Sequence, residues 1–212
     1  MENAENIQAG RAAAKRKREP TQRLKGSPLN EADWVDAATD ILVDEDVRGI
    51  RIEALCAKLG VTKGSFYWHF AGRAGLLAAM LQNWRNRMTT NVIDRLGAQS
   101  GEPSIRLRAL LALPRRTRSP AFARIEQSIR DWSRRDTKAL EAVSEVDNIR
   151  LNYIAEIFEK HGFEPAVAQR RAYIAYTMLM GDSILRNTID LDNLDEFLDD
   201  ILGLLLKADS PL

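Results

Sequence analysis

The sequence predicts an all-α fold, and two observations support that prediction. Beyond the N-terminal segment, apolar residues recur at spacings of three and four, as in Trp34, Val35, Ala38, Ile41 and Leu42. No segment shows the apolar–polar alternation between turn signals that is typical of a β-strand. With 212 residues, of which 45% are hydrophobic and 29% charged, the chain has the balance of a globular protein that buries a core.

Each expected helix has a boundary signal or an apolar stripe of its own. Pro28 and Asn30 give a start signal for the first helix. Pro103, Pro114 and Pro120 interrupt the middle of the chain, so short helices are expected between and after them. The other expected helices are Ile52 to Leu59, Leu76 to Met88, a stripe from Val143 to Ile157, a helix from Pro165 to about Asn187, and Leu191 to Leu206.

Several classes of protein are disfavoured by what the sequence lacks. Cys56 is the single cysteine and there are two histidines, so neither a disulfide framework nor a Cys/His zinc site is expected. No apolar run approaches the ~18 residues of a membrane span, and the N-terminus lacks the apolar segment of a secretory signal. We find no phosphate-binding glycine loop, nucleophile elbow or paired histidine ligands. We therefore expect a cytoplasmic protein with no catalytic residues, metal or cofactor.

Residues 50–70 contain the pattern of a helix-turn-helix. The stripe Ile52, Leu55, Cys56 and Leu59 leads into Gly60, which can take the left-handed conformation of a tight turn. Thr62 is expected to cap the next helix through its hydroxyl. On that helix Phe66 and Phe70, four residues apart, are expected to face the core, and Cys56 is expected to be a small buried residue.

The second helix of such a motif enters the major groove of DNA. Its other faces carry a lysine, a small hydroxyl, two aromatic side chains with polar edges and a histidine, all of which suit phosphates and base edges. These residues are Lys63, Ser65, Tyr67, Trp68 and His69.

The segment GVTKGSFYWHF, followed by AGRAGLLAAML, resembles the DNA-binding signature of the tetracycline-repressor (TetR) family of bacterial transcriptional regulators. The resemblance covers about residues 28–88. It implies a three-helix DNA-binding head, a larger helical body that binds a small molecule, and a homodimer. Carried over by position, Lys63 and Gly64 would approach base edges, whereas phosphates or flanking bases would be contacted by Thr62, Ser65, Tyr67, Trp68 and His69, with Arg73 on a phosphate.

The sequence departs from the family pattern at Arg51, where a serine or threonine often precedes the second helix. The arginine loses a favoured N-cap but offers a charge that can reach a phosphate, and its role stays open. We expect three parts: a basic arm at 1–27, a helix-turn-helix domain at 28–75, and an effector-binding and dimerisation domain at 76–212.

Charge is unevenly distributed along the chain. Residues 1–28 carry a net charge of +4, residues 101–139 of +6 and residues 140–212 of −8, which suggests different partners for different parts. The KRKR run at 15–18 is expected to follow phosphates or enter a minor groove, although a solvated tail is the alternative. The arginines between 106 and 135 and the acidic residues between 190 and 200 are expected to be solvated faces.

The C-terminal helices indicate a dimer. The segment AYIAYTMLMG at 172–181 is apolar on nearly all sides, and the last helix has a similarly broad apolar face. We expect residues 165–207 to form an isologous homodimer interface, the alternative being that both helices lie in one monomer's core.

The body is also expected to bind a small, mostly apolar effector. Its large, adaptable side chains suit an apolar pocket with few polar groups, although ordinary core packing explains each of them singly. The helix from Arg73 to about Met88 would connect this pocket to the head. The candidate ligand-binding residues are Trp84, Met88, Trp132, Tyr153, Phe158, Tyr176, Met178 and Met180.

Together these features predict a transcriptional regulator, with repression favoured over activation, that binds a palindromic double-stranded operator and is released by its ligand. The alternative is an architectural or ligand-independent DNA-binding protein with a structural helical body. Binding preference for one palindrome would separate the two.

Overall fold

The computed structural model describes residues 29–98, 101–116, 121–186 and 188–207, and every regular element within these ranges is a helix. The all-α prediction is therefore confirmed. The chain divides into two units, Met1–Asn30 and Glu31–Leu212, and the described helices belong to the second. The predicted basic arm at 1–27 lies outside the described residues.

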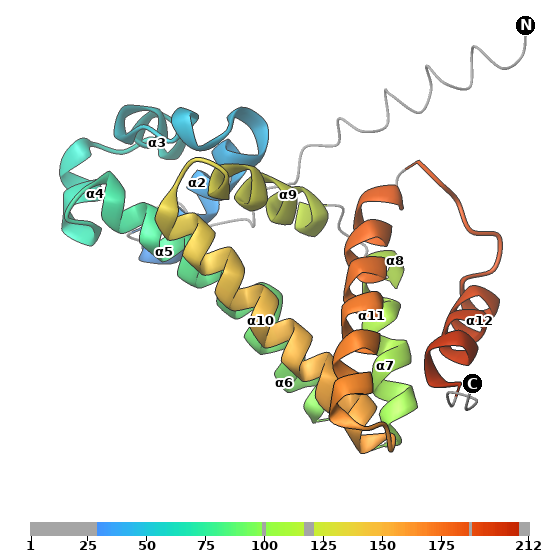
Figure 1. Ribbon diagram of the computed structural model, residues 1–212. Coiled ribbons are helices and arrows are strands. Elements are labelled where there is room, and N and C mark those ends of the chain that lie inside the picture. Colours follow the sequence, from blue (N-terminus) through green and yellow to red (C-terminus); the bar gives the residue numbers. More distant parts are fainter. Residues whose placement is uncertain (1–28, 99–100, 117–120, 187, 208–212) are drawn as a thin grey trace, which may run out of the picture. The chain divides into compact units, whose positions relative to one another are not determined.

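The helices of the second unit fall into an N-terminal set and a larger C-terminal set (Figure 1). The first set comprises α2 (Glu31–Glu45), the 3₁₀ turn η1 (Val47–Gly49), α3 (Ile52–Leu59), α4 (Lys63–His69) and α5 (Arg73–Arg85). The second comprises the π-helical segment η2 (Asn86–Thr90), α6 (Asn91–Gly97), α7 (Pro103–Leu111), α8 (Leu113–Arg116), α9 (Ala121–Ser133), α10 (Thr137–Lys160), α11 (Pro165–Leu185) and α12 (Leu194–Leu206).

The N-terminal helices pack around two aromatic rings. Trp34 of α2 and Phe66 of α4 are fully buried, and their rings meet edge to face with centroids 5.4 Å apart. Phe70 is also buried, as its spacing from Phe66 predicts. Gly60 ends α3 in the left-handed conformation with φ 69°, so the predicted glycine turn between the two short helices is present.

The capping role predicted for Thr62 is wrong. Thr62 occupies the N-cap position with an extended backbone, but its hydroxyl makes no capping hydrogen bond. The turn is closed instead by the backbone, because the N–H of Ser65 donates to the Thr62 carbonyl at 3.1 Å. The exposed hydroxyl is left available for other partners.

The predicted helix from Leu76 to Met88 is present but not uniform. Helix α5 leads into η2, whose five residues are π-helical, and α6 follows without a break. A π-helical turn is rare and is frequently found at functional sites. Helix α5 packs on α2 and α10, and α2 also packs on α9.

Proline and glycine set the helix boundaries of the larger set much as the sequence predicts. Pro103 and Pro165 begin α7 and α11, and α10 ends at Lys160 before the His161–Gly162 pair. Helix α10 packs on α7, α9 and α11, and α12 packs on α7 (Figure 1). The last helix begins at Leu194, three residues later than expected, because the Asn193 side chain caps it by accepting from two backbone N–H groups.

None of the described helices is both long enough and apolar enough to cross a membrane.

The acidic residues between 190 and 200 are exposed, as expected, but the expectation that the arginines between 106 and 135 form a solvated face needs correction. Arg108 of α7 pairs with Asp195 and Asp199 of α12, and Arg115 pairs with Asp182 of α11 at 2.6 Å. The Arg115–Asp182 pair is largely buried, whereas Asp195 and Asp199 stay exposed. Complementary charge thus joins different helices of one chain. Other arginines with such partners are Arg116, Arg124 and Arg130.

A buried guanidinium, that of Arg150 in α10, joins three further helical segments. Its Nε donates to Thr89 Oγ1 at 3.1 Å, and one Nη donates to Met88 O at 3.2 Å. The two Nη groups also donate to both carboxylate oxygens of Glu126, each at 3.1 Å, and to the Tyr176 hydroxyl at 3.2 Å. A guanidinium has five N–H donors, and all five are used here.

The rest of this network, which we call the Arg150 network, is equally complete. Glu126, only 5% exposed, also accepts from Trp84 Nε1 at 3.2 Å and from Arg130 Nε at 2.9 Å. Arg130 forms a two-pronged pair with Asp147 at 3.0 and 2.6 Å, and the Tyr176 hydroxyl donates to Asp147 at 2.6 Å. Two arginines and two carboxylates make the network electrically neutral, which a buried cluster requires.

The pKa shifts within the network keep Tyr176 and Asp147 in the protonation states that their hydrogen bonds require. Burial, partly opposed by the charge of Arg150, raises the pKa of Tyr176 to about 12, so its hydroxyl remains a donor. Burial alone would raise the pKa of Asp147, but hydrogen bonds from Arg130 and Tyr176 outweigh it and hold that pKa below its ordinary value. Asp147 therefore stabilises the fold at neutral pH, and this contribution is lost as the pH falls through its lowered pKa.

Truncating Phe66 should unfold the N-terminal helices most directly. Phe66→Ala removes a fully buried ring, so we expect a loss of about 3–5 kcal/mol in the free energy of unfolding, measured by urea titration. The matched control is Trp68→Ala on the same helix, where the side chain is 86% exposed and the expected change is within about 0.5 kcal/mol. Equal losses for the two variants would contradict this packing.

Neutralising Glu126 should leave Arg150 buried without its carboxylate. Glu126→Gln should therefore cost about 3–5 kcal/mol of unfolding free energy in the same titration. Glu145→Gln serves as the control, because Glu145 pairs with Arg85 at 2.7 Å but is 53% exposed, and its loss should cost about 0–1 kcal/mol. A Glu126→Gln variant as stable as this control would show that the Arg150 network does not hold the helices together.

Candidate functional site

One face of α4 is presented to solvent while the other is fixed in the core. Tyr67 is 57% and Trp68 86% exposed, although neighbouring Phe66 is fully buried. Large aromatic side chains seldom stay in water without a partner. The helix therefore offers a rigid, exposed surface of the residue types that the sequence analysis selected.

The remaining predicted residues of α4 lie on or beside this surface. Thr62, Lys63 and Gly64 are exposed, and Ser65 is half-buried. His69 is also half-buried, with its ring 6.3 Å from that of Trp34. His69 thus contributes to packing as well as to the rim of the surface.

Gly64 has no internal steric reason to be glycine. A Cβ added there would meet only the Thr62 hydroxyl, at an ordinary 3.6 Å. Glycine inside a helix costs about 1 kcal/mol relative to alanine, so a benefit elsewhere is expected. Close approach of the α4 backbone to a partner outside the chain would supply that benefit.

Lys63 is paired in the absence of a partner. Its Nζ lies 2.6 Å from Glu53 Oε1 of α3, and both side chains are mostly exposed. This hydrogen bond raises the pKa of Lys63 and lowers the pKa of Glu53. Sequence reasoning missed Glu53, because the ten-residue separation becomes a contact only when α3 and α4 cross.

Arg73 has an internal role that the sequence did not reveal. Its Nε donates to the carbonyl of Ile50 at 2.6 Å, and one Nη donates to the carbonyl of Val47. The start of α5 is thereby tied to the backbone that precedes α3. The predicted phosphate contact of Arg73 stays a prediction. Arg51, at the N-cap position of α3, makes no side-chain cap bond and is exposed, as its sequence predicts.

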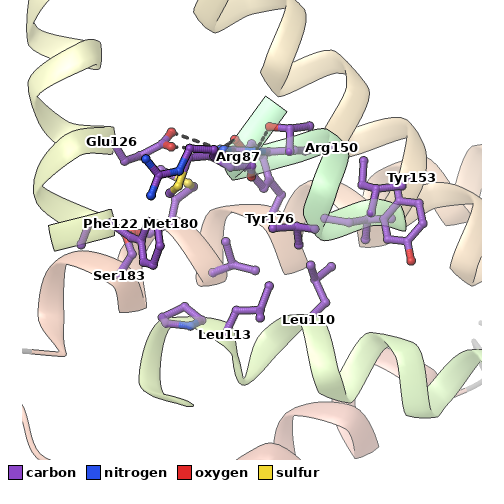
Figure 2. A pocket seen from close by; sticks show the side chains of 18 of the residues that line it. Arg87, Leu110, Leu113, Phe122, Glu126, Arg150, Tyr153, Tyr176, Met180 and Ser183 are labelled. Atoms are coloured by element: carbon purple, nitrogen blue, oxygen red, sulfur yellow. Dashed lines mark hydrogen bonds and ion pairs between the residues drawn. The ribbon is translucent and has the colours of Figure 1, made fainter. Parts of the chain in front are cut away.

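A cavity of about 270 Å³ lies in the larger helical set, between η2, α6, α7, α8, α9, α10 and α11. Figure 2 shows Glu126 and Arg150 of the Arg150 network on one side of it, and Leu110 and Leu113 on the opposite side. The cavity is therefore apolar over one wall and ionic, but neutral, over the other.

Four of the eight predicted ligand residues line this cavity: Met88, Tyr153, Tyr176 and Met180. The other four do not. Trp84 donates to Glu126 from behind the wall, and Phe158 is fully buried in the core. Trp132 faces a separate hollow beside α2 and η1, and Met178 packs against the core.

Several lining residues were not foreseen, chiefly apolar residues of the middle helices. In sequence they belong to the same stripes as core residues, so no local signal distinguishes them. Examples are Leu110, Leu113, Phe122 and Leu179.

Residues 35–80 match the family model of bacterial regulatory proteins, tetR family. Two regulators of Pseudomonas putida are 31% identical to this chain over 65 residues: the HTH-type transcriptional regulator SrpR and the uncharacterized HTH-type transcriptional regulator TtgW. These matches span 31% of this chain, 30% of SrpR and 48% of TtgW, so the chain covers less than half the length of either relative.

Solved structures extend the similarity of fold to most of the chain. A transcriptional regulator from Rhodococcus sp. Rha1 has a TM-score of 0.65 at 16% identity, covering 84% of this chain and 96% of its own. FadR from Bacillus subtilis, solved in complex with stearoyl-CoA, has a TM-score of 0.62 at 12% identity, covering 84% and 98%. A putative regulator from Saccharomonospora viridis, in complex with choline, has a TM-score of 0.66 at 14% identity, covering 82% and 94%.

The matched residues contain the exposed face of α4 and the helices that hold it, and the larger helical set has the fold of these regulators. Residues 35–80, which contain the helix-turn-helix, are thus similar to bacterial regulatory proteins of the tetR family.

Proposed function

We propose that this protein is a transcriptional regulator, acting in the cytoplasm as a repressor, that binds a palindromic operator as a homodimer and leaves it when a small ligand fills its cavity. The observation that carries the proposal is the exposed face of α4, where Tyr67 and Trp68 stand in solvent on a helix anchored by Phe66. Tyrosine, lysine and small hydroxyl side chains bind phosphates and base edges, and two such helices fit major grooves about 34–36 Å apart.

In this proposal DNA takes over Lys63 from Glu53. In the free protein Lys63 is held by a carboxylate only 2.6 Å away, but the pair is exposed and contributes little to stability. A phosphate or a guanine edge offers the ammonium group a stronger partner. Gly64 would let the backbone of α4 come close to the groove.

Dimerisation is supported by apolar side chains that one chain leaves in water. Tyr173 and Ile174 of α11 are 63% and 56% exposed, and Leu204 of α12 is 70% exposed. Ile184 and Leu185, further along α11, are also exposed. A two-fold partner covering these helices would bury them and set the spacing of the two α4 helices.

Release would pass through α5. Its first turn is tied by Arg73 to the backbone before α3, and its last turn leads into η2, where Met88 and Thr89 line the cavity and accept from Arg150. A ligand that moves η2 would tilt α5 and change the spacing of the heads. Shifting the ratio of the non-binding to the operator-binding arrangement of the heads from 1:99 to 99:1 requires about 5.5 kcal/mol of differential ligand affinity.

The fold accommodates ligands in relatives, since FadR was solved with stearoyl-CoA and the S. viridis protein with choline. An architectural, ligand-independent DNA-binding protein is the second candidate. The cavity of about 270 Å³ favours the first, because a purely structural body has no need of one.

Substitutions on α4 should separate DNA binding from folding. The operator is first isolated as the genomic DNA fragments that the purified protein retains. Lys63→Ala and Tyr67→Phe should then each weaken operator binding about tenfold or more, by filter binding or fluorescence anisotropy, with no change in melting temperature. Lys160→Ala, at an exposed site at the end of α10, is the control and should bind normally. Normal binding by both α4 variants would show that this surface does not contact DNA.

A charge within the exposed apolar face of α11 should separate the two subunits. We expect wild-type protein to sediment as a dimer at micromolar concentration, and Ile174→Glu as a folded monomer that has lost palindrome-specific affinity, because burying the new carboxylate at an interface is costly. Leu140→Glu introduces the same charge at a 51% exposed site on α10 and should remain dimeric. A monomeric wild type, or a dimeric Ile174→Glu variant, would contradict the proposed interface.

A further inference from the structure

The polar wall of the cavity has no free hydrogen-bonding capacity. All five N–H donors of Arg150 are used, and both oxygens of Glu126 accept two bonds each. The Tyr176 hydroxyl donates to Asp147 and accepts from Arg130 and Arg150, which is its full complement. A polar ligand group placed here would have to break existing bonds. Apart from the Tyr153 hydroxyl, which lines the cavity and is buried with no hydrogen-bond partner among the described residues, the interior accommodates an apolar body without such a loss.

The solvent-facing part of the lining has a different character. Arg87 and Arg95 line the cavity and are exposed, so they mark where it opens to water. Arg87 Nη1 lies 3.2 Å from Asp36, and both of these side chains are at least half exposed. Arg95 uses its Nε on the carbonyl of Asn91, and its two Nη groups have no partner among the residues that the structure describes.

No acidic side chain in the described lining balances the positive charge at this opening. Among the lining residues the single carboxylate is Glu126, which is buried and saturated by the Arg150 network. Glu126 neutralises the arginine in the deep wall. At the opening Arg87 has exposed Asp36 as its partner, whereas Arg95 has no carboxylate partner among the described residues. The opening therefore favours an anion over a neutral group and disfavours a cation.

From the saturated polar wall and the arginine-lined opening we infer that the cavity binds a small anionic amphiphile. Its apolar body fills the interior against Leu110, Leu113 and Met180, and its anionic group, a carboxylate or a group of similar charge, lies at the opening on Arg95, with Arg87 as a second cation of the lining. This inference rests on the proposed ligand-responsive function and assigns the class of ligand to it. A volume of about 270 Å³ holds roughly nine water-sized groups, so a chain of about eight carbons fits the interior.

Three probes with the same eight-carbon chain test the charge. Octanoate, 1-octanol and octyltrimethylammonium are titrated into the full-length protein by isothermal calorimetry at low salt. Octanoate should bind about fivefold to tenfold more tightly than 1-octanol, and octyltrimethylammonium more weakly than both. Excess 1-octanol should displace octanoate, which shows that the two share one cavity. The preference for octanoate should shrink at high salt, because the arginines are exposed.

Substitutions at the opening locate the anion. Arg95→Gln should lower octanoate affinity to the level of 1-octanol and leave 1-octanol affinity unchanged, and Arg95→Lys should retain most of the preference. Arg134→Gln is the matched control, since Arg134 is an exposed arginine outside the cavity lining and outside residues 165–207, and it should bind all three probes as wild type does. Equal effects of Arg95→Gln and Arg134→Gln would overturn the assignment of Arg95.

The outcomes separate this inference from the proposed function. If 1-octanol or the ammonium probe binds as tightly as octanoate, or if none of the three binds, the anionic class is wrong. Release by a different ligand could then still be found in an operator-binding screen. If octanoate binds through Arg95 but operator affinity is unchanged at saturation, the ligand class stands and the coupling to DNA fails.

Discussion

The guanidinium of Arg150 is the contact on which the larger helical set depends. From α10 it reaches η2 through Met88 and Thr89, α9 through Glu126 and α11 through Tyr176. Each of these acceptors would lose a hydrogen bond inside the protein if the arginine were absent, and Glu126 would keep only its bonds from Trp84 and Arg130. The neutral balance of two arginines and two carboxylates makes the cluster tolerable inside the protein. The same cluster forms one wall of the cavity, so the element that fixes the helices is also the one that a ligand would meet.

Two arginines of similar chemistry hold the two ends of one connecting helix. Arg73 binds the start of α5 to backbone carbonyls beside the exposed α4 surface, whereas Arg150 binds the π-helical continuation of α5 to the cavity wall. The helix between them is rigid, since Leu76, Met80 and Trp84 are buried along it. A shift imposed at η2 would therefore be carried to the head rather than absorbed along the way, which is the requirement for coupling two separate sites.

The sequence was informative wherever the determining contacts are local. The Phe66–Phe70 spacing, the Gly60 turn and the prolines at the starts of α7 and α11 specify local structure by short-range sterics and periodicity, and all are present. It was uninformative where the partners are far apart in the chain. Glu53 beside Lys63, and the pairing of Arg108 and Arg115 with acidic residues of α12 and α11, follow from tertiary packing. Cavity residues such as Leu110 belong to the same apolar stripes as core residues, so only the three-dimensional arrangement distinguishes them. The capping bond expected of Thr62 was replaced by a backbone bond that composition does not encode.

The operator affinity of an Arg150→Lys variant tests the central claim most directly. Lysine keeps the charge opposite Glu126 and the length of the side chain, but its three donors radiate from one nitrogen and cannot serve the spread of acceptors on η2, α9 and α11. The variant should remain folded and dimeric, and Arg134→Lys is the appropriate control because Arg134 is exposed and lies outside both the cavity lining and residues 165–207. If the Arg150 network sets the position of α5, the variant should bind the isolated operator at least tenfold more weakly than the control, because the heads are no longer held at one spacing. Operator affinity equal to that of the control would contradict the account.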